Sequence, residues 1–185
     1  MANKEPKGVK VGEKVADFEA MDLHDEKFQL SKALKEGPLV LIFYRGQWCP
    51  FCNKHLKELE SNLEKIYDQN AKVVAISPEK SEFLKRTADK TKASFRLLHD
   101  EGYQISNLFD VTNETGTLER FMVNTMLGAK LKKANTDESQ RLPIPATFII
   151  DQDQKIVWRH FDPNYKKRSK VSDIIANLPK NKVHG

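Results

Sequence analysis

The chain has 185 residues, of which 39% are hydrophobic and 31% charged. This balance is typical of a globular protein and excludes long disorder, and the length allows one domain with a full core that needs no disulfides. The net charge of +5 is modest and spread along the chain, so it does not predict nucleic-acid binding. We interpret the densest basic run, residues 166–170 (KKRSK), as a solvated segment before a helix, with a binding patch as the alternative.

The N-terminal stretch, MANKEPKGVKVGEK, contains no apolar signal region. The longest apolar run, residues 39–44, is much shorter than the roughly 20 residues that span a membrane. We therefore expect a cytoplasmic protein, in a reducing compartment where two nearby cysteines are catalytic or metal-binding rather than structural. We also expect a loose lysine-rich arm over residues 1–10, a single domain over 11–178 and a short tail over 179–185.

Taken in order, the apolar periodicity predicts strands that alternate with helices. Alternating apolar residues before residue 31 predict a hairpin, and the continuously apolar residues 39–44 predict a strand buried on both faces. Residues 50–68 follow with apolar side chains at helical spacing. Further strands are expected at 71–77, 95–98, 146–150 and 155–160, and further helices at 81–92, 118–131 and 170–178, with Ser31 and Ser81 as N-caps. This order predicts an α/β fold, a central mixed β-sheet flanked by helices in three layers, with a helical insertion around residues 103–141.

The only two cysteines, Cys49 and Cys52, lie at the joint between the apolar strand and the following helix. A thiol attacks as the thiolate, which a helix N-terminus stabilises through its free N–H groups and positive dipole end. The spacing allows a reversible disulfide, so one thiol can attack an oxidised substrate and the other can resolve the product. We therefore expect a dithiol redox centre without a cofactor, in which Cys49, at the helix end, is the more exposed thiol.

Two other interpretations of the cysteine pair stay open. Half of a structural zinc site would need a second pair of ligands, but the chain has no other cysteine and its five histidines lack metal-ligand spacing, so no metal is expected. Inert core cysteines are the other possibility. Pro145 is similarly open, because a proline just before a strand is either a purposeful cis proline or a simple strand-entry residue.

The motif Trp48-Cys49-Pro50-Phe51-Cys52, with Ile144-Pro145-Ala146-Thr147-Phe148 downstream, resembles the thioredoxin fold, in which the proline is cis and packs against the disulfide. The likeness extends to the peroxiredoxin-like family of alkyl hydroperoxide reductase C and thiol-specific antioxidant proteins. It covers roughly residues 11–175 and includes the segments VGEKVADF (11–18), VAISPE (74–79), FRLLHD (95–100) and FIID (148–151). The resemblance implies a thioredoxin-like, peroxiredoxin-type fold.

Several positions depart from the peroxiredoxin pattern, in which a proline, a threonine and an arginine accompany the peroxidatic cysteine. Aligned without gaps, Arg45 replaces that proline, Cys49 replaces the threonine and Pro145 replaces the arginine, while Cys52 falls on the peroxidatic position. In thioredoxins the first cysteine of the pair attacks, which is Cys49 here. The nucleophile therefore stays open, because helix-end electrostatics favours Cys49 and the register favours Cys52.

Three neighbours of the cysteines are candidates for tuning the site. Arg45 could lower a thiol pKa or hold a peroxide oxygen, or it is an exposed turn residue. His55, three residues after Cys52, lies on the same helix face and could transfer a proton, or it is a plain polar helix residue. Trp48 is expected to shield the disulfide, as the aromatic residue before the thioredoxin motif does.

The resemblance implies a thiol peroxidase that reduces hydroperoxides through a Cys49–Cys52 dithiol–disulfide cycle, recycled by thioredoxin or a low-molecular-weight thiol. The altered peroxide pocket favours an alternative, a thioredoxin-like protein disulfide oxidoreductase. A non-catalytic thioredoxin-fold binding module is a third hypothesis, against which the intact cysteine motif and Pro145 argue. Neither a membrane nor a nucleic acid is expected as a partner, and we expect a monomer or a homodimer.

Overall fold

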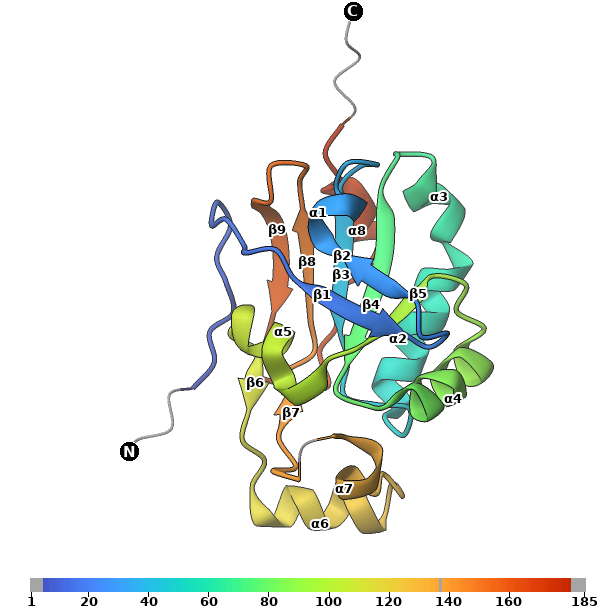
Figure 1. Ribbon diagram of the computed structural model, residues 1–185, viewed down its shortest axis with the longest axis vertical. Coiled ribbons are helices and arrows are strands. Elements are labelled where there is room, and N and C mark those ends of the chain that lie inside the picture. The colour runs from blue at the N-terminus through green and yellow to red at the C-terminus, as the bar shows by residue number, and fades with distance from the viewer. Residues whose placement is uncertain (1–4, 137, 181–185) are drawn as a thin grey trace, which may run out of the picture.

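The computed structural model describes residues 5–136 and 138–180, and its centre is a seven-stranded sheet of order β2-β1-β5-β4-β3-β8-β9 (Figure 1). Three neighbouring strands are parallel: β3 (Leu39–Phe43), β4 (Lys72–Ser77) and β5 (Arg96–His99). The antiparallel flanks are β1 (Glu19–Asp22) and β2 (Lys27–Gln29) beside β5, and β8 (Ala146–Ile150) and β9 (Ile156–Phe161) beside β3.

Strand β3 lies inside the sheet, and all five of its residues are buried. Successive side chains of a strand point to opposite faces, so Val40 and Ile42 enter one hydrophobic core while Leu41 and Phe43 enter the other. The continuous apolar run thus reflects a strand that is covered on both faces, as predicted.

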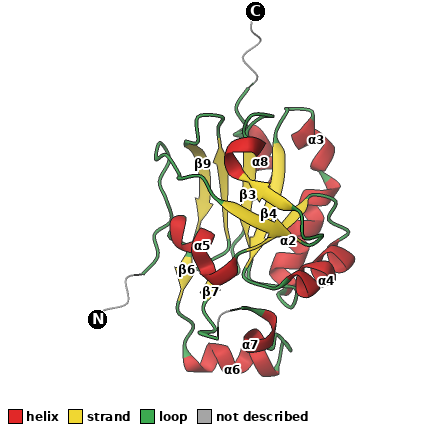
Figure 2. Ribbon diagram, viewed as in Figure 1, coloured by secondary structure: helices red, strands yellow, loops and turns green. Residues whose placement is uncertain are grey.

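Helices on both faces of the sheet complete three layers (Figure 2). One core is closed by α2 (Pro50–Ser61), α3 (Leu63–Tyr67), α4 (Ser81–Thr91) and α8 (Val171–Ala176). The other core is closed by α1 (Leu30–Ala33) and α5 (Gln104–Leu108). The predicted α/β fold with a mixed sheet between two helical layers is confirmed.

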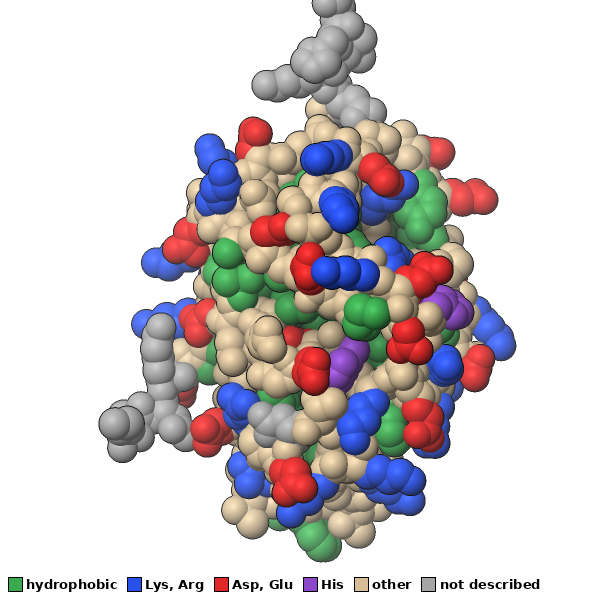
Figure 3. All heavy atoms as spheres, viewed as in Figure 1, with side chains coloured by type: hydrophobic (Ala, Val, Ile, Leu, Met, Phe, Trp, Pro, Cys, Tyr) green, Lys and Arg blue, Asp and Glu red, His purple; other side chains and the backbone are tan. Residues whose placement is uncertain are grey.

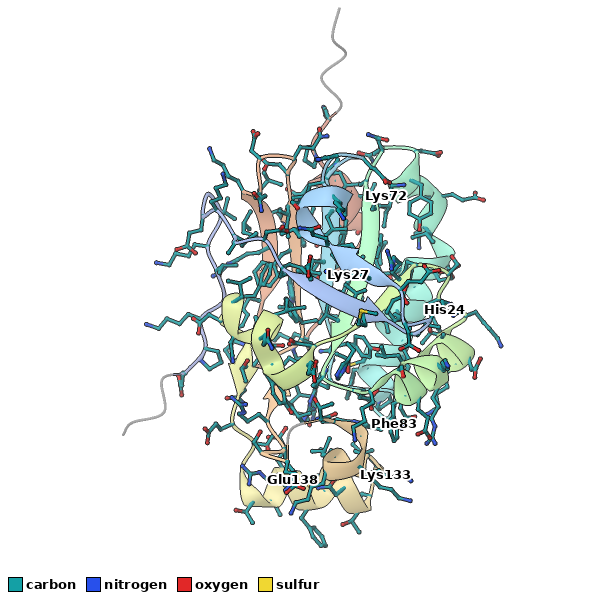
Figure 4. All side chains as sticks on the ribbon, in the orientation of Figure 1. His24, Lys27, Lys72, Phe83, Lys133 and Glu138 are labelled. Atoms are coloured by element: carbon teal, nitrogen blue, oxygen red, sulfur yellow. The ribbon has the colours of Figure 1, made fainter. Side chains whose placement is uncertain are left out.

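Most of the expected insertion, from β6 (Thr112–Asn113) to β7 (Leu142–Pro143), forms one end of the molecule (Figure 1). It contains α6 (Thr117–Thr125) and α7 (Leu131–Ala134), and β6 pairs with β7 in a two-stranded sheet, while η1 (Glu101–Tyr103) and α5 precede it in the chain. Figure 4 shows Lys133 and Glu138 at this end of the molecule, below Phe83 of α4. Helix α6 and its C-cap residue leave large apolar side chains in solvent, among them Leu118 at 73% and Met126 at 74% exposure.

Several expected boundaries are corrected. The helix expected over 50–68 is interrupted at Asn62, whose φ of −117° is not helical, and the helix expected over 118–131 is two short helices. The expected N-caps are also wrong. Ser31 lies inside α1, where its N–H and hydroxyl donate to Asp17, and Lys80 rather than Ser81 occupies the N-cap of α4.

The expectation of a loose arm over residues 1–10 is wrong for residues 7–9, which are held by hydrogen bonds. The N–H of Gly8 donates to the carbonyl of Asp110 at 2.9 Å, and the guanidinium of Arg159 donates to three carbonyls of the same stretch. Residues 1–4 lie outside the described part, as do residues 181–185 of the expected tail. Within residues 5–136 and 138–180, no helix is long and apolar enough to cross a membrane.

Candidate active site

The two cysteines lie at the start of helix α2, which follows strand β3. Cys49 is the N-cap residue of α2 with extended backbone, Pro50 opens the helix, and Cys52 lies in its first turn. Proline suits this place because the first N–H groups of a helix have no intrahelical partner. Both cysteines are free thiols and each is only 1% exposed.

Arg168, in the segment between β9 and α8, lies over the two sulfur atoms. Its Nη2 is 3.2 Å from Sγ of Cys52 and 3.9 Å from Sγ of Cys49. The backbone N–H of Arg45 also donates to Sγ of Cys52, at 3.5 Å. Nη1 of Arg168 donates to the carbonyls of Tyr165 and Lys167, so the segment curls around its own guanidinium.

The surroundings of the two thiols shift their pKa values in opposite directions. Burial alone would raise the pKa of Cys52, but the hydrogen bond from Cys49, the charge of Arg168 and the N–H of Arg45 outweigh it and lower this pKa to about 6. The hydrogen bond to Cys52, burial and the negative charge of Cys52 all raise the pKa of Cys49. The arrangement therefore favours Cys52 over Cys49 as the thiolate of the pair.

The expectation that Cys49 is the exposed thiol is wrong in terms of solvent exposure, because Cys49 and Cys52 are each only 1% exposed. The electrostatic argument for Cys49 also changes. A helix N-terminus offers only partial charge, whereas Arg168 supplies a full positive charge and lies closer to Cys52. Electrostatics and register now favour the same thiol.

Arg45 and Trp48 form one wall of the site. The Arg45 guanidinium lies 5.0 Å from the ring of Trp48 and 4.4 Å from that of Tyr165, which are cation–π distances, and it is ion-paired with Glu119 of α6. Arg45 is 4% and Trp48 6% exposed, so Arg45 is not an exposed turn residue. Through Glu119, helix α6 is tied to the rim of the thiol site.

His55 is buried one turn after Cys52, on the side of α2 that faces β8 and the Arg168 segment. Its Nε2 shares a hydrogen bond of 3.2 Å with Oγ of Ser169, and Oγ of Ser169 shares one of 2.8 Å with Oγ1 of Thr147. Burial first, and then the positive charge of Arg168, lower the pKa of His55 to about 4. The imidazole is therefore neutral at neutral pH.

A buried carboxyl group, Glu79, lies on the inner side of the motif. Oε2 of Glu79 accepts the N–H of Gln47 at 2.9 Å, while Oε1 has no hydrogen-bond partner among the described residues. A Cβ on Gly46 would lie 2.6 Å from this oxygen and 2.4 Å from Nε1 of Trp48, so the turn requires glycine. Burial, reinforced by the thiolate of Cys52, raises the pKa of Glu79 to about 8.

Pro145 is buried and immediately precedes β8, where Ala146 pairs with Phe43 at the end of β3. It therefore stands beside the strand that leads to the thiols. The described residues contain no cis peptide bond, so the cis proline implied by the thioredoxin resemblance is not present. A metal site is not formed either: in the described part of the chain, no three His, Cys, Asp or Glu side chains gather to hold an ion.

The structure thus gathers Cys49, Cys52, Arg45, Trp48 and His55 at one joint, with Pro145 beside β3. The residues that sequence reasoning missed come from elsewhere in the chain: Glu79, Glu119, Arg168 and Ser169. A partial signal existed for Arg168 and Ser169, which belong to the basic run at 166–170, and for Glu79, which ends the segment 74–79 that carries the family resemblance.

A mixed sheet with a dithiol at a strand–helix joint defines a thioredoxin-like oxidoreductase. The sequence model of the AhpC/TSA family matches residues 11–159. Peroxiredoxin Bcp of Escherichia coli K12 is 29% identical over 170 residues, which cover 91% of this chain and 94% of that protein. The chain belongs to the AhpC/TSA family, and it is an oxidoreductase of the thiol peroxidase class.

Solved structures agree on the fold. The crystal structure of peroxidoxin BcpB from Mycobacterium tuberculosis aligns with a TM-score of 0.70 at 24% identity, covering 91% of this chain and 96% of that one. A yeast mitochondrial 1-Cys peroxiredoxin, whose thiol is described as resolved via glutathione/thioredoxin systems, aligns with a TM-score of 0.68 at 15% identity, covering 90% and 73%. The predicted thioredoxin-like, peroxiredoxin-type fold is confirmed.

Proposed function

We propose that Cys52 is the peroxidatic thiol of this peroxidase and Cys49 its resolving thiol, acting on hydroperoxides in the cytoplasm. The observation that carries the proposal is the position of Arg168, whose guanidinium is 3.2 Å from the sulfur of Cys52. A thiolate is the attacking species, and Cys52 has the charge partner and the N–H donor that stabilise one.

The first step oxidises Cys52. Its thiolate attacks the terminal oxygen of the hydroperoxide, an S–O bond forms and the O–O bond breaks, and the leaving alkoxide takes a proton from water. The peroxide is reduced by two electrons, and Cys52 becomes a sulfenic acid. Arg168 and the N–H of Arg45 hold the thiolate before this step.

The second step uses Cys49, the N-cap residue of the helix whose first turn contains Cys52. The sulfur of Cys49 attacks that of the sulfenic acid, the S–S bond forms, and hydroxide leaves with the proton of Cys49 as water. A dithiol protein of the thioredoxin type, or a small thiol, then returns two electrons by thiol–disulfide exchange. Because both sulfurs are buried, the segment that carries Arg168 must move aside for this exchange.

Single substitutions test this assignment. In Cys49→Ser, the first peroxide equivalent should still be consumed and leave Cys52 as sulfenic acid, which a dimedone adduct detected by mass spectrometry would identify. In Cys52→Ser, consumption should fall to the rate of a free thiol. Peroxide consumption that survives in Cys52→Ser and is lost in Cys49→Ser would reverse the two roles.

A thioredoxin-like disulfide oxidoreductase is the second candidate, favoured by Pro145 beside β3, where peroxiredoxins have arginine. Reduction of insulin disulfides by the same variants separates the two. The peroxidase assignment expects slow insulin reduction and fast peroxide turnover in the wild type. Fast insulin reduction that depends on Cys49, with negligible peroxide turnover, would favour the oxidoreductase instead.

A further inference from the structure

Arg168 belongs to an irregular segment, and the position of its side chain over the thiols needs a cause. An arginine side chain has many rotamers, and fixing it over one atom costs conformational entropy. The two carbonyls that Arg168 binds, those of Tyr165 and Lys167, belong to the same segment. The guanidinium therefore follows wherever the segment is placed.

The next residue, Ser169, fixes that placement. It is 4% exposed, whereas its neighbours Lys167 and Lys170 are exposed. Its hydroxyl lies between two equally buried partners from different elements, His55 of α2 and Thr147 of β8, at 3.2 and 2.8 Å. Buried polar groups of this kind are expensive to leave unpaired, so the three side chains hold one another in place.

We propose that His55, Ser169 and Thr147 form a buried hydrogen-bonded anchor that positions Arg168 over Cys52 and so sets the fraction of Cys52 present as thiolate. The three are positioning residues, since the side chain that contacts the sulfurs is that of Arg168. His55, for which the sequence left proton transfer and a plain polar helix residue open, here serves as the neutral partner of Ser169. This inference rests on the proposed role of Cys52 as the attacking thiol.

The charged and titratable groups around Cys52 and His55 determine what a titration of the Cys52 thiol reports. Around Cys52, the charged or titratable side chains are those of Tyr44, Cys49, Glu79 and Arg168. Around His55 they are those of His160 and Arg168. Arg168 is common to both sets, which is why a change at the anchor should be felt at Cys52 through Arg168.

The test is an ultraviolet titration of the thiolate in a Cys49→Ser background, where Cys52 is the only cysteine. Ser169→Ala should raise the midpoint of Cys52 by about one pH unit, which lowers the thiolate fraction below the midpoint about tenfold. Arg168→Gln should raise it at least as much. Adding Ser169→Ala to Arg168→Gln should then change nothing further, because the anchor acts only through the guanidinium.

Matched variants separate positioning from general destabilisation. Ser169→Thr keeps the hydroxyl and should restore most of the thiolate, and His55→Asn or Thr147→Val each remove one contact and replace Ser169→Ala if that variant does not fold. Lys170→Gln removes an exposed positive charge next to Ser169 and should leave the midpoint unchanged.

A wild-type midpoint in correctly folded Ser169→Ala, His55→Asn and Thr147→Val would overturn the proposal. So would a second, equal shift when Ser169→Ala is added to Arg168→Gln. The titration does not use peroxide, so it reads the anchor even if Cys49 proves to be the attacking thiol, which the turnover of the two serine variants would reveal separately.

Discussion

The guanidinium of Arg168 lies 3.2 Å from the sulfur of Cys52, although the two residues are 116 positions apart in the chain. Cys52 comes with the strand–helix joint, and Arg168 comes with the last segment before α8. The site is therefore complete only when the C-terminal part of the domain packs against α2. The reactivity of Cys52 thus depends on a tertiary contact with a residue near the C-terminal end of the chain.

The pH dependence of peroxide reduction follows from this contact. The pKa of Cys52 is lowered to about 6, against an ordinary value of 9.0. The second-order rate constant of the first turnover should be flat above neutrality and fall about tenfold per unit below pH 6, as the thiolate is protonated. Rapid mixing across this range measures it. A midpoint near 9.0 would show that Cys52 has no effective charge partner.

The ion pair between Arg45 and Glu119 should contribute to stability because Arg45 is only 4% exposed while Glu119 is 36% exposed. Glu119→Gln leaves the buried Arg45 charge without its carboxylate partner, and we expect the free energy of unfolding to fall by about 1–2 kcal/mol. Urea denaturation measures it. Glu82→Gln breaks an exposed pair with Arg86 and should cost about 0.5 kcal/mol or less. Equal effects in the two variants would contradict the prediction.

Glu79 should make stability fall as the pH rises. Its pKa is raised from 4.5 to about 8, mainly by burial, so the folded state holds a proton that the unfolded state releases between these values. The unfolding free energy of the wild type minus that of Glu79→Gln should therefore decrease as the pH rises through this window. Urea denaturation at several pH values tests it. A constant difference would place the ionisation of Glu79 near its ordinary pKa.

Packing in the centre of the sheet predicts a large effect at Leu41, which is fully buried in β3. Leu41→Ala should lower the free energy of unfolding by about 3 kcal/mol, because the deletion leaves a cavity between two rigid layers. Leu118→Ala is the matched control, since that side chain is 73% exposed and should change stability by about 0.5 kcal/mol or less. Chemical denaturation of both variants gives the comparison.

Much of the fold could be predicted because the relevant patterns are local. The continuous apolar run of β3 and the helical spacing after Pro50 follow directly from burial of one strand and one helix face. The break at Asn62 could not be predicted, since apolar spacing continues across it through Leu63 and Ile66. Helix termini depend on backbone geometry that single residue types, such as Ser31 and Ser81, do not specify.

The site could be predicted only along the joint itself. Spacing and residue type identified the cysteines, but which thiol is ionised depends on Arg168, and nothing in a basic run such as residues 166–170 says which member turns inward. The surface view shows why such runs are hard to interpret: cationic and anionic side chains intermingle over the face of the molecule in Figure 3. The error about the exposure of Cys49 has the same origin, because the cover comes from distant segments.

The Arg168 contact also bears on the reduction potential of the cysteine pair. Arg168 and the N–H of Arg45 stabilise a negative charge that exists only while Cys52 is reduced. Formation of the disulfide removes that charge, so the stabilisation belongs to the dithiol form alone. A couple whose reduced form is stabilised has a less negative potential and is a stronger oxidant. The arrangement that prepares Cys52 for attack therefore also favours its return to the dithiol, and drives the cycle forward with weakly reducing thiols.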